Sequence, residues 1–310
     1  MKGKKIISAA LAGVMALSLT ACGGGSTQET TAAPAADSKA EETTAAAEGS
    51  EAATGEGVTK EDLKVGFIFI GDENEGYTAA HYKGAKEMQE ALGLNDDQLI
   101  VKWNIPEDET AKDAAMDLAD QGCQIVFANS FGHESYVIEA AKEYPEVQFC
   151  HATGYQAASS GLSNFHNYFA SIYEARYLAG IAAGLKTETN KLGYVAAYPF
   201  AEVISGYTAF YLGAKSVNPD VTMEIMYTNS WNDPTVESQV AKALIDRGCD
   251  VISQHSDSTA PATTAEENGV WQVGYNNDMI EAAPEASLIS ARIDWGIYVT
   301  EAVQHVIDGT

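Results

Sequence analysis

Two patterns of apolar positions alternate along most of this chain. From about residue 61 onward, short apolar runs bounded by glycine are followed by longer segments whose apolar positions recur every three or four residues. This regular alternation, with near-continuous apolar strands, predicts parallel β-sheets covered by helices on both faces, an α/β fold. The predicted strands are 64–70, 99–103, 124–128, 147–151, 192–197, 221–227, 250–254 and 270–275, and the predicted helices are 77–92, 108–121, 133–143, 201–216, 234–247 and 259–268.

The strand and helix unit occurs twice. The segment from Leu118 to Ser130 matches the segment from Leu244 to Ser256, with Leu, Asp, Gly, Cys and Ser at corresponding places. Two copies of one unit predict two lobes that face a cleft and close about a hinge. Because open parallel sheets bind ligands outside the carboxyl ends of their strands, the residues after each strand are the candidate site.

The first residues have the pattern of an export signal. Three lysines lie in residues 1–5, an apolar run covers 6–19, and Cys22 follows Leu-Thr-Ala. A charged start, a short apolar region and small residues at the end are typical of a secretory signal peptide, here 1–21. The cysteine after Leu-Thr-Ala resembles a bacterial lipobox, so we expect Cys22 to carry a diacylglycerol that anchors the protein to the outside of the bacterial cell membrane.

Residues 22–60 are predicted to be a disordered acidic tether that begins at the lipidated cysteine. The segment is rich in Gly, Ser, Thr, Ala and Glu and has no aromatic residue. Such a composition cannot bury enough apolar surface to offset the entropy of ordering the chain. We therefore assign 61–165 together with 288–310 to the N-terminal lobe and 166–287 to the C-terminal lobe.

Charge and motifs exclude several classes of function. The chain has 18 Lys and Arg against 44 Asp and Glu, a net charge of −26, so nucleic acid is not an expected partner. The nucleophile elbow, the phosphate-binding loops and the zinc-protease motif are absent from the sequence, and the histidines form no metal-spaced pair on one helix. We expect no enzyme, no catalytic residue, no cofactor and no bound metal. His255 near Asp257 could act as an acid or base, but a hydrogen-bonding role is the preferred interpretation.

The predicted strand ends carry aromatic, acidic and uncharged polar side chains. The three arginines of the folded part, Arg176, Arg247 and Arg292, do not follow strands. Since phosphate and carboxylate ligands usually need such a partner, a neutral or weakly cationic ligand with flat faces is expected. The candidate ligand-binding residues are Asp72, Tyr77, His81, Ser130, Phe131, Tyr155, Trp231, Asp233, His255, Asp257, Asn276 and Asp278.

Each candidate also has a purely structural interpretation. Tyr77 and Phe131 could be core residues, and Asp233 and Asp257 precede helices and could cap them. For Trp231 the ligand interpretation is preferred, because an exposed indole directly after a strand would otherwise be costly.

Several motifs together resemble the basic membrane protein (BMP) family. These substrate-binding lipoproteins of ABC importers are similar to purine-nucleoside receptor lipoproteins and have a two-lobed type I periplasmic-binding fold. The likeness runs from about residue 64 to 310. The motifs are Ile-Val-Phe-Ala-Asn-Ser-Phe-Gly at 125–132, Tyr-Pro at 144–145 with His-Ala-Thr-Gly-Tyr at 151–155, Ile-Tyr-Glu-Ala-Arg-Tyr-Leu-Ala-Gly at 172–180, Gly-Ala-Lys-Ser-Val-Asn-Pro at 213–219 and Asn-Ser-Trp-Asn-Asp-Pro at 229–234.

The resemblance implies a monomeric receptor that captures a purine nucleoside or nucleobase and passes it to an ABC permease in the membrane. It places Tyr77 and Trp231 where the family has ring-stacking aromatics, and Asn276 and Asp278 where it has an acidic pair that contacts the ligand. Thr78 and Ala79 follow Tyr77 where the nucleoside receptors have Asn-Gln, and the acidic pair is half amide. Family members continue past the position of Thr310, so the end of the fold is expected to lie beyond this sequence.

Other ligands and functions stay open. A free purine base, a flavin-like heterocycle or a monosaccharide would also suit stacking rings beside Asp and Asn. An extracellular nucleosidase that uses the cleft acids, or a ligand sensor that signals to a membrane partner, would use the same cleft.

Overall fold

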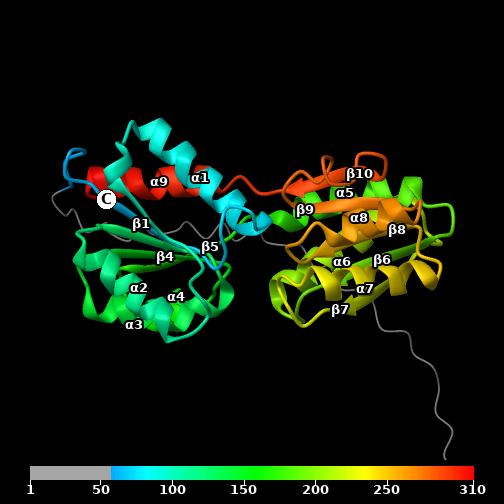
Figure 1. Cartoon of the computed structure of the whole chain (residues 1–310), viewed down its shortest axis with the longest axis horizontal. Coiled ribbons are helices and arrows are strands. Elements are labelled where there is room, and N and C mark those ends of the chain that lie inside the picture. Colours follow the sequence, from blue (N-terminus) through cyan, green and yellow to red (C-terminus); the bar gives the residue numbers. More distant parts are fainter. Residues whose placement is uncertain (1–56) are drawn as a thin grey trace, which may run out of the picture. The chain divides into compact units, whose positions relative to one another are not determined.

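The computed structural model describes residues 57–310, which contain two five-stranded parallel sheets (Figure 1). The first sheet has the order β2-β1-β3-β4-β5, and the second, read from its β7 edge, has the order β7-β6-β8-β9-β10. Corresponding strands therefore hold corresponding places, as expected for two copies of one unit, and the predicted α/β class is confirmed. The strands are β1 (Val65–Ile68), β2 (Leu99–Lys102), β3 (Ile125–Ala128), β4 (Gln148–Ala152), β5 (Phe165–Tyr168), β6 (Lys191–Ala196), β7 (Thr222–Tyr227), β8 (Val251–His255), β9 (Trp271–Asn276) and β10 (Ser287–Arg292).

Helices follow the strands of both sheets, and the six predicted helices agree with the structure to within a residue at each end. Among the described helices, none combines the length and the apolar character needed to cross a bilayer. The predicted signal peptide, the lipidated Cys22 and most of the predicted tether lie outside the described residues. The helices are α1 (Gly76–Leu92), α2 (Glu109–Asp120), α3 (Glu134–Glu143), α4 (Ala157–Ser160), α5 (Ile172–Lys186), α6 (Ala201–Val217), α7 (Pro234–Asp246), α8 (Ala260–Glu267) and α9 (Trp295–Asp308), with short 3₁₀ turns at Asp96–Gln98 and Phe131–His133.

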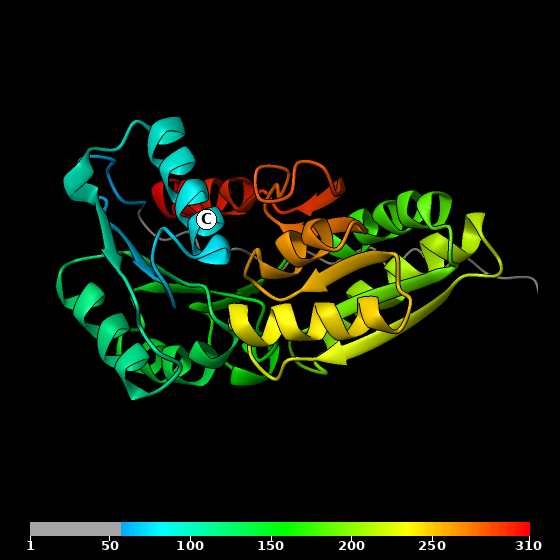
Figure 2. The same cartoon turned by 45° about the vertical axis from the view of Figure 1, so that its right-hand side comes forward.

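The division between the lobes differs from the predicted boundaries. The first lobe keeps β5, which pairs with β4 as far as Tyr168, although a boundary was predicted after residue 165. The second lobe keeps β10, which pairs with β9 through Arg292, although 288–310 was assigned to the first lobe. Both are edge strands with partly polar or exposed positions, so they lack the continuous apolar pattern of central strands. Only α9 returns to the first lobe, where it packs against α1 (Figure 2).

The repeated glycine and cysteine that revealed the duplication end one helix in each lobe. Gly122 follows α2 with φ 86°, and Gly248 follows α7 with φ 93°, the left-handed conformation that glycine adopts without strain. One residue later, the N–H of Cys123 or Cys249 donates to the carbonyl of the leucine five residues before it. Both cysteines are buried beneath the first strand of their sheet. The motif thus turns the chain from helix to strand in both lobes.

Glycines also allow the close crossing of α5 and α6 in the second lobe. A Cβ on Gly180 would overlap the carbonyl of Phe210, and a Cβ on Gly213 would overlap the carbonyl of Tyr177. The two helix backbones therefore touch directly, and any side chain at these positions would force them apart. This crossing fixes the position of the first turn of α6, which contributes to the site described below.

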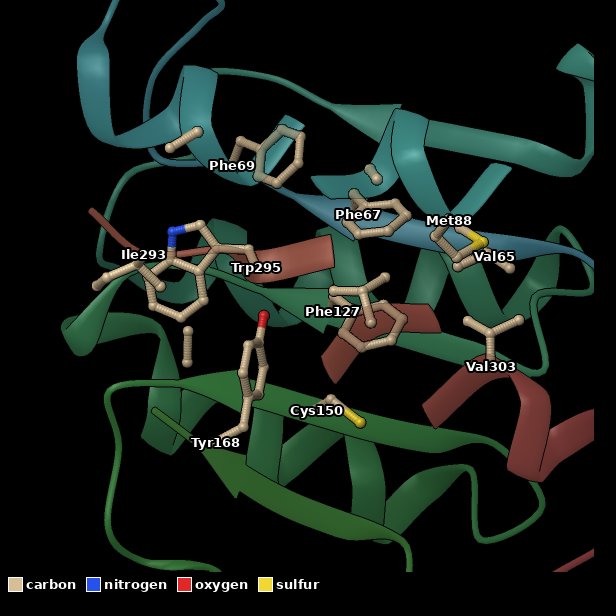
Figure 3. Close-up of a cluster of buried hydrophobic side chains, with 14 of the residues drawn as sticks. Val65, Phe67, Phe69, Met88, Phe127, Cys150, Tyr168, Ile293, Trp295 and Val303 are labelled. Atoms are coloured by element: carbon tan, nitrogen blue, oxygen red, sulfur yellow. The ribbon is translucent and has the colours of Figure 1, made fainter. Parts of the chain in front are cut away.

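The core of the first lobe depends on α9 as well as on the sheet (Figure 3). Phe67 and Phe127 from neighbouring strands stack at 5.0 Å between ring centroids. Trp295, at the start of α9, is 3% exposed and packs edge-on to Tyr168 at 5.9 Å. The C-terminal helix therefore completes this core after the chain has passed through the second lobe.

Candidate functional site

A cavity of about 310 Å³ lies at the carboxyl ends of the strands and is lined by residues of both lobes. This is where open parallel sheets bind ligands, and the volume falls at the lower end of the range for small-molecule sites. The first lobe contributes Ile70, Gly71, Glu75, Tyr77, Glu107, Asn129, Ser130, Phe131 and Thr153, and the second contributes Tyr198, Glu202, Ser230, Trp231, Asn232, Asp257 and Tyr275.

Aromatic rings from both lobes gather at this cavity. Phe131 of the first lobe stacks on Phe200 of the second, with 4.5 Å between centroids and 14° between ring planes. Tyr198 stacks on Phe200 at 5.2 Å and meets Trp231 edge-on at 5.1 Å. Trp231 also lies 6.3 Å from Phe131, across the boundary between the lobes. Such a wall can cover the face of a flat ligand and also hold the lobes together.

The start of α1 positions Tyr77 in the cavity. The Glu75 carboxylate caps the helix by accepting hydrogen bonds from the N–H groups of Tyr77 and Thr78, both at 2.7 Å. The Tyr77 hydroxyl donates to the carbonyl of Asn129 at 2.6 Å, which fixes the ring next to the end of β3. The Asn129 side chain in turn accepts from the N–H of Ile70, so the ends of β1 and β3 are tied together.

Four acidic side chains, Glu75, Glu107, Glu202 and Asp257, line the cavity, and none of its lining residues within the described chain is Lys, Arg or His. Glu107 accepts hydrogen bonds from the Ser130 hydroxyl at 2.6 Å and from the N–H of Gly132 at 2.7 Å. Burial raises the pKa of Glu202 to about 8 and holds the pKa of Asp257 well above its usual range. Nearby acids add to the effect on Asp257. The cavity therefore favours ligands with N–H and O–H donors or with positive charge and disfavours anions.

The backbone at the end of β4 is strained where it meets the cavity. Thr153 has φ 66°, a conformation that β-branched residues rarely adopt and that costs about 1–3 kcal/mol. Its hydroxyl oxygen is buried and has no hydrogen-bond partner within the described residues. Unusual backbone of this kind concentrates at ligand sites, which agrees with the position of Thr153 in the lining.

Of the twelve candidate residues from the sequence, the structure brings together five at the cavity: Tyr77, Ser130, Phe131, Trp231 and Asp257. Tyr77 and Phe131 therefore have a place in the lining as well as packing partners. Asp257 follows β8, and its backbone N–H donates to the carbonyl of Trp231, which joins two of the second lobe's strand ends.

Four other candidates lie outside the cavity, and three of them belong to turns or caps. The Asp233 side chain caps α7 by accepting from the N–H groups of Thr235 and Val236, the structural role considered in the sequence. Asp72 accepts from the N–H of Asn74 in the turn before α1. Asp278 is exposed and accepts from the N–H of Ile280, while Tyr155 is 74% exposed with its ring 6.2 Å from Phe131. None of these four lines the cavity.

The last three candidates are buried behind the cavity. His81 is 3% exposed and stacks on Trp295 at 3.9 Å. His255 is 1% exposed and packs on Tyr275 at 4.1 Å, and burial holds the pKa values of both histidines well below their usual range. Asn276 is 3% exposed and accepts a hydrogen bond from the Trp295 indole, next to the passage of the chain between the lobes. Their side chains contribute to packing rather than to the lining.

Several lining residues were missed by sequence reasoning. Glu75 caps α1 and Glu202 lies in the first turn of α6. Acids are common at helix starts, so these positions alone do not indicate a ligand site. Glu107 lies in the loop before α2, and its carboxylate is held at the cavity by the hydrogen bond from the Ser130 hydroxyl. Tyr275 is the residue before the last in β9, so its position near the carboxyl end of the strand could have indicated a place in the site. The order of the strands was needed to bring these residues to one place.

The possible metal ligands and the cysteines of the described residues can be assessed from their positions. Within residues 57–310, His, Cys, Asp and Glu side chains form no group of three that could hold a metal ion. Cys123, Cys150 and Cys249 are buried free thiols, and burial raises their pKa values to about 11, 12 and 11. Thiols of this kind are unreactive.

Comparison with known families gives a match over the whole folded part. Residues 63–310 match the Bmp family model, described as ABC transporter substrate-binding protein, PnrA-like. This chain belongs to the Bmp family. The resemblance inferred from the motifs is thereby confirmed, and the chain is an ABC transporter substrate-binding protein.

Two named relatives of this Bmp-family chain differ in the ligand that their names give. It is 39% identical to a purine-binding protein of Brucella abortus, over 81% of this chain and 71% of the relative. It is 34% identical to a Haloferax volcanii protein named for glucose binding in ABC transport, over 81% of this chain and 62% of that protein. The solved structure of an ABC transporter solute-binding protein from Aeropyrum pernix has a TM-score of 0.67 and 19% identity, covering 80% of this chain and 71% of that one. That likeness supports the type I periplasmic-binding fold, and membership of this class implies an extracytoplasmic location.

Proposed function

We propose that this Bmp-family protein binds a purine nucleoside or nucleobase in the cavity between its lobes and delivers it to an ABC permease. The observation that carries the proposal is the lining itself, which combines aromatic rings with four carboxylates and has no cationic side chain. A flat heterocycle can stack on Trp231 and Tyr77, while carboxylates accept hydrogen bonds from its N–H groups or from ribose hydroxyls. The purine-binding relative supports the same ligand class.

The contacts between the lobes support capture by closure. The Phe131 ring of the first lobe stacks on Phe200 of the second, and the Asn277 side-chain amide donates to the carbonyl of Gly76. Both contacts join residues of different lobes. A bound ring would add contacts to both lobes and so favour this closed arrangement.

A monosaccharide is the second candidate ligand. Sugars also stack on indole and phenol rings and donate hydroxyl hydrogens to carboxylates, so the same lining suits them. The relative named for glucose binding favours this candidate at 34% identity. Purines are aromatic and monosaccharides are not. Competition between adenosine and glucose for the same cavity shows which class binds more tightly.

The deciding experiment is a thermal-shift and calorimetric panel on the whole chain with adenosine, guanosine, inosine, adenine, hypoxanthine, ribose, glucose and riboflavin. A ligand that binds the folded state raises the melting temperature by mass action. Binding of purines that glucose does not compete away supports the proposal. Binding of glucose alone, or of riboflavin alone, overturns the purine ligand and leaves the substrate-binding class intact.

Binding without chemical change is the second part of the proposal. Incubation of the protein with inosine or adenosine should release no free base over hours, as measured by chromatography. Base release that increases with protein concentration and disappears in an Asp257→Asn variant would instead indicate a nucleosidase.

We also propose that Cys22 carries the lipid that holds the protein at the membrane. The support is the sequence alone, a signal-like apolar run ending in Leu-Thr-Ala before the cysteine. In a bacterial host the wild-type chain should partition into the membrane fraction, and Cys22→Ala should not incorporate labelled fatty acid. Equal labelling of the two chains would refute the anchor.

A further inference from the structure

Glu202 differs from other acids of the cavity in having a buried, unpaired carboxyl oxygen. It lies in the first turn of α6 and lines the cavity, and its Oε2 has no hydrogen-bond partner within the described residues. By contrast, Glu75 caps α1, and Glu107 accepts from Ser130 and Gly132. A buried polar oxygen without a partner is costly, so a ligand that supplies one should bind there.

The charges around Glu202 come from several elements. The other acids of the cavity are Glu75 at the start of α1, Glu107 before α2 and Asp257 after β8, and Tyr77, Tyr198 and Tyr275 complete its titratable groups. The fully buried Arg176 of α5 lies 4.3 Å from the centre of the Tyr275 ring, and the neutral His255 packs on that same ring. Both side chains also lie next to Gly206, one turn after Glu202 on α6.

This environment favours the protonated carboxyl. Burial raises the pKa of Glu202 to about 8, and the neighbouring acids give a further reason to avoid another negative charge. The first turn of α6 favours the charged form, but that effect reaches at most about 2 kcal/mol in partly buried sites and does not offset the burial. At neutral pH, Glu202 is therefore a carboxylic acid with one O–H donor and one C=O acceptor.

The protonation state determines which edge of a base the carboxyl can pair with. A carboxylic acid forms two parallel hydrogen bonds with an edge that has one donor and one acceptor. Adenine offers its amino group beside a ring nitrogen, and hypoxanthine offers a ring N–H beside its carbonyl. Guanine offers the same ring N–H and carbonyl as hypoxanthine. A carboxylate offers two acceptors and no donor, so it cannot form this pair of hydrogen bonds with adenine or hypoxanthine.

We propose that Glu202 binds the purine edge as a neutral carboxylic acid, through one donated and one accepted hydrogen bond, and so fills the unpartnered buried oxygen. The proposal rests on the proposed purine-binding function and names the residue of that site that contacts the base. Buried carboxylic acids kept neutral so that they can donate a hydrogen bond are known in enzyme sites.

The test compares the wild-type chain with Glu202→Gln and Glu202→Ala, titrated with adenosine by calorimetry from about pH 6.5 to 9.5, a range that spans a pKa near 8. Adenosine itself does not titrate in this range. The Gln amide keeps one donor and one acceptor at every pH, so it reproduces the neutral acid. Glu224→Gln is the control, because Glu224 pairs with Arg247 on the surface of the same lobe.

Wild-type affinity should be constant up to about pH 8 and then fall up to tenfold per pH unit, because the carboxylate must be reprotonated to bind. Glu202→Gln should bind like the wild type at neutral pH and keep that affinity at alkaline pH. Glu202→Ala should lose roughly 5- to 150-fold at neutral pH, the loss expected for two hydrogen bonds.

The outcomes separate this proposal from the proposed function. Purine binding that is independent of pH, with Glu202→Gln and Glu202→Ala both within twofold of the wild type, overturns the role of Glu202 and leaves the purine function standing. Absence of binding by any purine at any pH would refute the proposed function itself, with melting curves of all variants serving as the check of folding.

Discussion

Replacement of Trp231 by alanine tests the aromatic wall most directly. The indole lies in the loop after β7, lines the cavity and is partly buried. Its edge-on partner Tyr198 belongs to the same lobe, whereas Phe131 lies 6.3 Å away in the other lobe. The substitution thus removes a candidate ligand-stacking surface together with one contact between the lobes.

The expected loss of affinity depends on which contacts of Trp231 differ between the free and the ligand-bound protein. The pair with Tyr198 lies within one lobe, so its loss affects the stability of the free and bound states alike and largely cancels from the affinity. Stacking of a base on an aromatic side chain contributes about 1–3 kcal/mol, and that part is lost only from the complex. Trp231→Ala should therefore weaken purine binding roughly 5- to 150-fold.

The assay is calorimetric titration with adenosine, with Trp231→Phe and Trp271→Ala as companions. Phenylalanine retains an aromatic face and should recover part of the affinity. Trp271 begins β9, and the Lys186 ammonium lies 3.9 Å from its ring centre, outside the cavity lining. Trp271→Ala therefore removes the same type of side chain and should lower the melting temperature without changing the affinity.

One result would refute this reasoning. If Trp231→Ala binds adenosine within twofold of the wild type, while its melting curve shows a folded protein, the indole does not stack on the ligand. The ring cluster would then serve only the contact between the lobes.

Other consequences of the structure can be measured separately. Gly180→Ala should lower the free energy of unfolding in urea by at least about 1–3 kcal/mol, because the new Cβ overlaps a backbone carbonyl of α6; unchanged stability would contradict the close helix crossing. Phe200→Ala should speed ligand release in stopped flow roughly 2- to 12-fold by removing a ring pair between the lobes, and an unchanged rate would show that this pair does not hold the closed state. Cys150, with its pKa raised to about 12 by burial, should react with a thiol reagent only in denaturant; rapid labelling of the native protein would contradict its burial. Because burial raises the pKa of Glu202 to about 8 in the folded protein, from 4.5 in the unfolded chain, the free energy of unfolding should fall as pH rises between these values. Glu202→Gln should remove that part of the slope in urea titrations at several pH values.

The sequence alone determined most of the secondary structure and the duplication. Its helices were predictable because their apolar positions repeat with helical spacing, and its central strands because they are buried on both faces. Edge strands β5 and β10 escaped this reasoning, since they mix polar and exposed positions. The motifs quoted from both lobes were sufficient to predict the family.

The sequence also determined part of the site, by the rule that ligands bind after the strands. That rule found Phe131 and Asp257, which follow the central strands β3 and β8, and Trp231, which follows the edge strand β7. It also selected His255 and Asn276, because it does not say which way a side chain points. Both are buried behind the cavity.

Only the tertiary structure decided which acids share one cavity and what their charge state is. Glu75, Glu107, Glu202 and Asp257 are far apart along the chain, and their approach depends on the strand order of both sheets and on the contacts between the lobes. A pKa depends on burial and on neighbouring charges, which are properties of the folded arrangement rather than of any residue type. The sequence therefore indicated a flat ligand without negative charge, and the fold brought Glu202 and three other acids to the cavity proposed to hold it.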